Sequence, residues 1–176
     1  ACRERQVLTL MGLLRGAPGS TVSLLVLRGT TVDPHVVDLT RESISGELVT
    51  GKRLPGGEGY VRVSSFGPGA AAAIRKQVDA LHEAGAAGTI IDLRGIADGM
   101  ADEAIAAARH FVKTGVLATL AGRGTERTVT SAAAGDGAVT SPVVLMVSNG
   151  TDNAAEIFAA ALLGTHRADL VGEPTT

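Results

Sequence analysis

The spacing of apolar residues divides the chain at about residue 60 into two parts. In the second part, short apolar runs alternate with stretches whose apolar residues recur every three or four positions, which predicts strands alternating with helices. The predicted strands are 60–63, 89–93, 116–120, 143–147 and 168–171, and the predicted helices are 70–83, 102–113 and 153–163. Such alternation indicates an α/β core with a largely parallel central sheet.

The first part of the chain has too few elements to bury its own apolar residues. Its pattern predicts a helix over 3–14, a strand over 21–27 and another strand over 36–39. Because so few elements cannot cover their own faces, we expect residues 1–30 to be the closing part of a small module that begins before residue 1. A missing segment, a second copy of the chain or a partner would cover its apolar residues, which include Leu8, Leu10, Met11, Leu24 and Val26.

The boundary between the two parts is predicted from composition. Residues 46–59 are rich in glycine and proline, which is typical of a connection without regular structure. We therefore divide the chain into a partial module (1–30), a connecting strand and loop (31–59) and an α/β core (60–176).

Composition narrows the classes of partner and cofactor. The 176 residues carry 16 Lys and Arg against 18 Asp and Glu, with three phenylalanines and one tyrosine as the aromatic residues, which argues against nucleic acid as a partner. No apolar run reaches the roughly 18 residues that a membrane-spanning helix needs. The single cysteine excludes an internal disulfide, and the four histidines lack the spacing of metal ligands. We expect no membrane span, no metal and no cofactor.

Two strand-to-helix junctions are candidate sites. One is 92–99, after the predicted strand 89–93, and the other is 147–156, which leads into the predicted helix 153–163. Sites form at such junctions because the first N–H groups of a helix are unpaired and its dipole adds positive potential. Either junction could hold a negatively charged oxygen.

Ordered motifs along almost the whole chain resemble the C-terminal processing, or tail-specific, proteases, a family of PDZ-containing serine peptidases. Leu14–Val22 is similar to the family's turn before the last PDZ strand, and Leu39–Glu42 to the strand that returns to the core. In the core, the resemblance rests on Gly59–Phe66, Asp92–Arg94, Ala155–Leu162, Arg167–Ala168 and Val171–Thr175. It implies a PDZ-like first module, a crotonase- or ClpP-like core and a Ser-Lys dyad that cuts unstructured C-terminal tails.

The sequence departs from this family at the residues that perform the reaction. The family's nucleophilic serine lies three residues before the helix glutamate matched by Glu156, and here that residue is Asn153, whose amide is not a nucleophile. The family's lysine, a base that must be held neutral, would follow the segment 173–175. We expect it to be absent because the chain stops at Thr176.

The resemblance assigns the oxyanion donors to backbone N–H groups of Ala154, Asp98 and Gly99. The family's turn after Asp-Leu-Arg is Asn-x-Gly-Gly, whereas this chain has Ile-Ala-Asp-Gly at 96–99. The Asp98 carboxylate therefore stands where the family has glycine, and its charge would oppose a developing oxyanion.

Asn153 also has a structural interpretation. Asparagine is a favoured N-cap residue, and Asn153 with Glu156 has the spacing of a capping box. A serine would cap the same helix, so the replacement would retain the fold while removing the nucleophile.

Polar residues near Asn153 leave open the alternative that another residue acts as the nucleophile. Thr151 is the candidate alternative, two residues from the expected position, while Ser148, Asp152 and His166 are the other polar groups nearby. Further residues have structural interpretations: we expect an ion pair between Asp92 and Arg94, and solvated side chains at His82 and His110.

The expected function is that of a carboxy-terminal processing peptidase that has lost its activity. The alternative is a noncatalytic module of the same fold that binds peptides or lipids. The expected partners are C-terminal tails of peptides or proteins, together with a second copy of the chain or a missing segment that covers the partial module. The resemblance alone implies a periplasmic or extracellular location.

Overall fold

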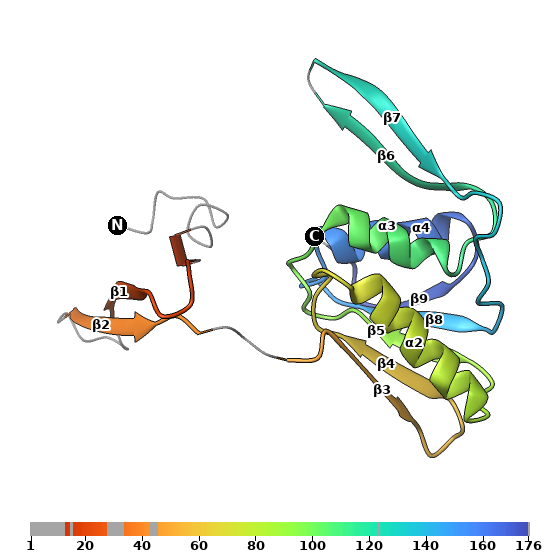
Figure 1. The fold of residues 1–176 in the computed structure, drawn as a ribbon, viewed down its shortest axis with the longest axis horizontal. Coiled ribbons are helices and arrows are strands. Elements are labelled where there is room, and N and C mark those ends of the chain that lie inside the picture. Colours follow the sequence, from red (N-terminus) through yellow and green to blue (C-terminus); the bar gives the residue numbers. More distant parts are fainter. Residues whose placement is uncertain (1–12, 15, 28–33, 43–45, 123, 176) are drawn as a thin grey trace. The chain divides into compact units, whose positions relative to one another are not determined.

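The computed structural model describes residues 13–14, 16–27, 34–42, 46–122 and 124–175 (Figure 1). The chain divides into two compact units, Ala1–Gly46 and Glu47–Thr176, and each is described by itself. This division falls within the predicted connection 31–59, so the strands of that segment belong to different units.

The first unit contains one antiparallel pair of strands. β1 (Thr21–Val26) pairs with β2 (His35–Thr40), which confirms the two predicted strands. Most of the predicted helix 3–14 lies outside the described residues. None of the described residues of this unit is buried. Of the apolar residues expected to be uncovered, Leu24 and Val26 are half-buried, and Leu8, Leu10 and Met11 lie outside the described residues.

The second unit is built around a five-stranded sheet (Figure 1). The strand order is β3-β4-β5-β8-β9, with bounds Val49–Arg53, Gly59–Val63, Thr89–Asp92, Val143–Val147 and Asp169–Gly172. Strands β4, β5, β8 and β9 are parallel to one another, and β3 joins one edge antiparallel. This sheet confirms the predicted α/β fold.

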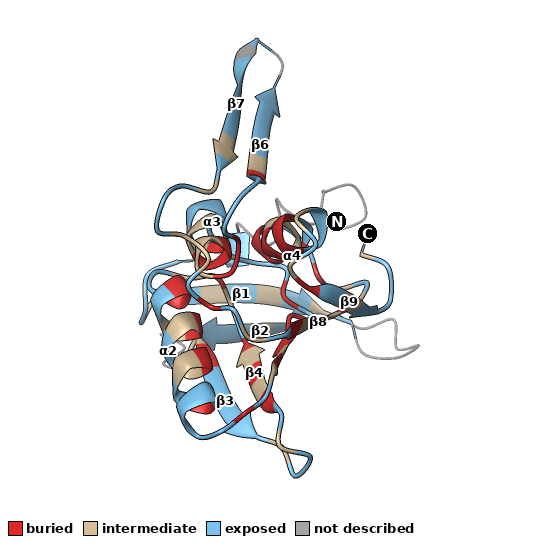
Figure 2. Cartoon of the chain, turned by 90° about the vertical axis from the view of Figure 1, so that its right-hand side faces the viewer, coloured by how far each residue is buried: buried red, intermediate tan, exposed pale blue. Residues whose placement is uncertain are grey.

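Three helices cover this sheet to form the core (Figure 2). They are α2 (Ala70–Glu83), α3 (Ala101–Arg109) and α4 (Ala154–Gly164). Helix α2 packs on β3 and β4, α4 packs on β9, and α3 lies against α2 and α4. The three phenylalanines are fully buried: the ring centroid of Phe158 lies 5.6 Å from that of Phe66 and 5.8 Å from that of Phe111. This aromatic cluster anchors the beginning of α4.

Strand β3 corrects the prediction that 46–59 lacks regular structure. Its residues pair with β4 from Val49 opposite Val63 to Arg53 opposite Gly59. Only Val49 is buried, while the rest of the strand is exposed. An edge strand with one buried side chain has no apolar alternation, and its glycine and charged residues gave the appearance of a loop.

The strand predicted at 116–120 forms, but outside the central sheet. β6 (Val116–Gly122) pairs with β7 (Thr125–Ser131) in a separate antiparallel hairpin, which extends away from the helices and the sheet (Figures 1 and 2). Strand β7 was not predicted because Val129 is its single large apolar residue.

Candidate functional site

The two predicted junctions meet at the carboxyl ends of β5 and β8. The Thr151 hydroxyl donates a hydrogen bond to the Leu93 carbonyl at 3.0 Å, and the Asp152 N–H donates to the Ile96 carbonyl at 2.8 Å. The Gly95 N–H donates to the Ser148 hydroxyl oxygen at 3.2 Å. The loops 93–99 and 148–153 are therefore tied together directly before α4.

Asn153 is the exposed residue at the start of α4, and its backbone is strained. Its φ is 56° and its ψ is −120°, and its side chain makes no capping hydrogen bond. The predicted capping box is therefore wrong: a capping residue has an extended backbone, whereas a positive φ is costly for any residue other than glycine. The Asn153 N–H instead donates to Asp152 Oδ1 at 2.6 Å.

This strain has a known use in enzymes. In hydrolases of another fold, a strained strand-to-helix turn exposes the nucleophilic side chain at the end of the sheet. Residues in such conformations cluster at functional sites. The backbone at Asn153 thus has the form that would present a nucleophile, while the side chain is an amide.

The strain at Asn153 predicts an unusual effect of glycine. Replacing Asn153 with glycine is expected to raise the free energy of unfolding by about 1 kcal/mol, because glycine adopts this backbone freely and the gain exceeds the cost in the unfolded chain. The control is Asn149→Gly in the same loop, since Asn149 has no positive φ; it is expected to lose about 0.5 kcal/mol. Urea denaturation of both variants checks the prediction, and destabilisation by Asn153→Gly would refute it.

The predicted oxyanion donors lie beside Asn153. Gly99 pairs with Phe66 in an isolated parallel bridge, and a Cβ atom at Gly99 would lie 2.7 Å from Phe66 Cβ and 3.0 Å from Ala154 Cβ. Gly99 and Ala154 are therefore held against each other. The Gly99 N–H donates to Asp98 Oδ1 at 2.9 Å, so the Asp98 carboxylate already occupies one of the predicted donors.

Thr151 and His166 are not presented at this site. Thr151 is fully buried, and its hydroxyl accepts from the Ser148 N–H at 3.0 Å while donating to Leu93. This placement gives Thr151 a structural role. His166 follows the carboxyl end of α4, about 16 Å along the helix from Asn153 at 1.5 Å per residue.

Asp92 lies at the end of β5 and is the centre of a polar network. Its side chain is 2% exposed and accepts hydrogen bonds from Arg94 Nε at 2.9 Å and Arg94 Nη2 at 2.8 Å, which confirms the predicted ion pair. The Tyr60 hydroxyl donates to it at 2.6 Å and Arg62 Nη1 at 3.2 Å. Burial alone would raise the pKa of Asp92, but the hydrogen bonds from Arg94 and Tyr60 and the charge of Arg62 hold that pKa well below its usual range.

The sequence did not predict the hydrogen bonds made by Tyr60, Arg62 and Glu103. The first two reach Asp92 from the neighbouring strand β4, where Arg62 lies opposite Asp92. Glu103 in α3 accepts hydrogen bonds from the N–H groups of Gly69 and Ala71, each at 2.9 Å, and so caps α2. Its position in a first helical turn was visible in the sequence, but its partners were not.

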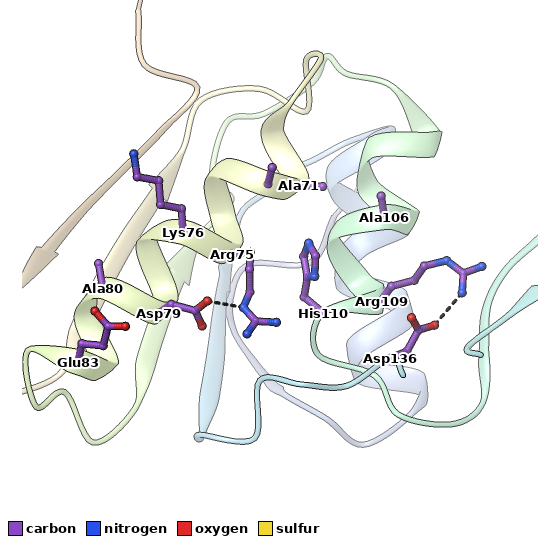
Figure 3. A pocket seen from close by; sticks show the side chains of 11 residues that line it. Ala71, Arg75, Lys76, Asp79, Ala80, Glu83, Ala106, Arg109, His110 and Asp136 are labelled. Atoms are coloured by element: carbon purple, nitrogen blue, oxygen red, sulfur yellow. Dashed lines mark hydrogen bonds and ion pairs between the residues drawn. The ribbon is translucent and has the colours of Figure 1, made fainter. Parts of the chain in front are cut away.

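A groove with a volume of about 930 Å³ lies between α2 and α3 (Figure 3). Four of its charged groups are paired, Arg75 with Asp79 at 2.6 Å and Arg109 with Asp136 at 2.7 Å. His110 faces it and is half-buried, which corrects the expectation of a solvated side chain. Burial and then the Arg75 charge lower the pKa of His110. No residue of the loops 93–99 or 148–153 lines this groove.

Comparisons with known proteins agree on one family. The family model described as peptidase family S41 matches residues 57–176. The carboxyl-terminal-processing protease of Synechocystis sp. is 36% identical over 167 residues, covering 92% of this chain and 39% of that protein. The carboxy-terminal processing protease CtpA of Bacillus subtilis is 31% identical over 167 residues, covering 94% of this chain and 35% of that protein.

A solved structure gives the same result. The photosystem II D1 C-terminal processing protease aligns with a TM-score of 0.70 and 28% identity, covering 91% of this chain and 45% of that one. The chain thus spans less than half the length of these relatives. Within the described residues, no helix is both long and apolar enough to cross a membrane. The same residues contain no group of three or more His, Cys, Asp and Glu side chains that could hold a metal ion.

Proposed function

The chain belongs to peptidase family S41, and from this premise we propose that it binds unstructured C-terminal tails of polypeptides without hydrolysing them. The observation that carries the proposal is Asn153, which occupies the exposed, strained turn before α4. Attack on a peptide carbonyl needs a hydroxyl, thiol or comparable nucleophile, and an amide supplies none.

The surrounding groups support loss of hydrolysis rather than a relocated reaction. The Thr151 hydroxyl is buried and bonded to backbone groups on both sides. The Asp98 carboxylate at the Gly99 N–H would oppose an oxyanion.

Peptide binding is proposed from three features of the site. The two loops are tied together by hydrogen bonds, and Gly99 remains packed on Ala154. The exposed Asn153 amide can both donate to and accept from a peptide backbone. These features support the proposal that the site binds a peptide backbone without cleaving it.

The test combines binding and turnover in one sample. A fluorescent, unstructured peptide with an apolar C-terminal tail is titrated with the chain, its anisotropy is recorded, and the mixture is examined by mass spectrometry. We expect saturable binding and no product, and Asn153→Ala should leave the peptide equally intact. Product whose formation is abolished by Thr151→Ala would show a relocated nucleophile. Binding of fatty acids but not of the peptide would favour the lipid-binding alternative.

Two further proposals concern the first unit and the location of the protein. We propose that the first unit is the closing part of a PDZ-like module, because Leu25, Leu27 and Val36 are 67%, 66% and 65% exposed, as in a module that needs more chain to cover it. Location in the periplasm or outside the cell is proposed from the family resemblance alone.

A further inference from the structure

Strand β6 has an outer edge that no other described strand pairs with. Within the part of the chain that the structure describes, β6 pairs with β7 alone. Its seven residues, Val116–Gly122, include no charged residue and no proline. Residues 119–122 are exposed, and Leu120 is 67% exposed. Natural sheets protect such edges with charges, prolines or covering elements, because an unprotected edge recruits another strand.

We propose that this edge pairs with β6 of a second copy of the chain, antiparallel and centred on Thr119. A two-fold axis places the same residues on both sides of the interface, so Thr119 lies opposite Thr119 of the second copy and Ala118 lies opposite Leu120. Leu120 of each copy then faces the small side chain of Ala118 of the other copy on the same side of the sheet. Threonine pairs and apolar pairs across strands are both stabilising, and no like charges meet.

The placement of the hairpin makes this pairing accessible. The hairpin extends away from the helices (Figures 1 and 2), while Leu117 at its base is buried, with 4% exposed. The base is therefore anchored and the outer half of β6 is free to meet another chain.

The pairing also explains the distribution of charge on the hairpin. A two-stranded ribbon is marginally stable alone, and joining two hairpins through β6 gives a four-stranded sheet in the order β7-β6-β6-β7. Glu126 and Arg127 lie on β7, which becomes the outer edge on both sides. The charged strand would thus protect the edges of the assembly, and the uncharged strand would form its centre.

A matched pair of lysine variants tests the proposal. Thr119→Lys places two like charges directly opposite each other across the two-fold axis, whereas Thr128→Lys makes the same change on β7, where Thr128 lies opposite Leu120 within the hairpin. Sedimentation equilibrium should show a dimer whose dissociation constant rises at least tenfold in Thr119→Lys and less than twofold in Thr128→Lys. Mixing Thr119→Lys with Thr119→Glu should restore association. A monomer at every concentration, or equal effects of the two lysine variants, would overturn the proposal.

Cysteine cross-linking tests the register independently of hairpin stability. In a Cys2→Ser background, Thr119→Cys places two thiols across the axis at about 5 Å between Cα atoms, within reach of a disulfide. Mild oxidation should give a covalent dimer with Thr119→Cys and at least tenfold less with Thr128→Cys. Equal cross-linking of the two variants would show that another surface, such as the first unit, makes the contact.

Discussion

Replacing Asp92 with alanine is expected to lower the free energy of unfolding at pH 7 by about 3 kcal/mol. The buried carboxylate accepts hydrogen bonds from Arg94, Tyr60 and Arg62, and its removal leaves these donors without their acceptor. The arginine side chains are 35% and 50% exposed, so water can solvate their charges. The loss is therefore smaller than the 5 kcal/mol or so that can follow the breaking of a fully buried pair.

The effect of Asp92 should depend on pH in a defined direction. Because the pKa of Asp92 is lowered in the folded state from about 3.9 in the unfolded chain, its contribution is complete at neutral pH and is lost as the pH falls below about 4. Urea denaturation at pH 7 and pH 2.5 should show a smaller difference between the wild type and Asp92→Ala at the lower pH. A difference that is constant with pH would contradict the ionic role.

An exposed ion pair provides the control for Asp92. Asp79 pairs with Arg75 at 2.6 Å, and its side chain is 45% exposed. Surface pairs of this kind contribute roughly 0.3 to 0.5 kcal/mol, so Asp79→Ala should have a much smaller effect at pH 7. Equal losses in the two variants would show that burial and the additional donors around Asp92 do not matter.

Replacing Phe158 with alanine is expected to lower the free energy of unfolding by about 3 to 5 kcal/mol. The ring is fully buried between Phe66 and Phe111, and alanine would leave a cavity that the surrounding helices cannot fill. The control is Phe158→Leu, which keeps most of the volume and should lose about 1 kcal/mol. Equilibrium denaturation measures both, and a loss below 1 kcal/mol for Phe158→Ala would mean that the aromatic cluster does not hold α4.

The sequence predicted those helices and strands in which the buried side chains are apolar and regularly spaced. Helix α2 and strand β8 have the predicted bounds, because each buries a regular set of side chains such as Ile74 and Val78 in the helix. The pairing of β6 was not predictable in this way. An apolar strand can join any sheet, and its partner β7 has a polar composition that resembles a loop.

The sequence identified the two junctions that the structure brings together, but it did not predict their geometry. The Asp92–Arg94 pair could be inferred because both residues lie in one turn, whereas Tyr60 and Arg62 come from another strand through its register. The spacing of Asn153 and Glu156 fits a capping box as well as a strained turn. Only the backbone angle, fixed by hydrogen bonds between the two loops, separates these interpretations.

The proposed loss of hydrolysis requires that the site hold no hydroxyl able to attack a peptide carbonyl. Exposing the chain to a phosphonofluoridate, which modifies activated serine and threonine hydroxyls, tests this claim without knowledge of the substrate sequence. We expect the intact mass to remain unchanged, apart from the background seen with the urea-denatured chain. A stoichiometric adduct on the native chain, mapped to Thr151 or Ser148, would show a reactive hydroxyl and refute the proposed loss of hydrolysis.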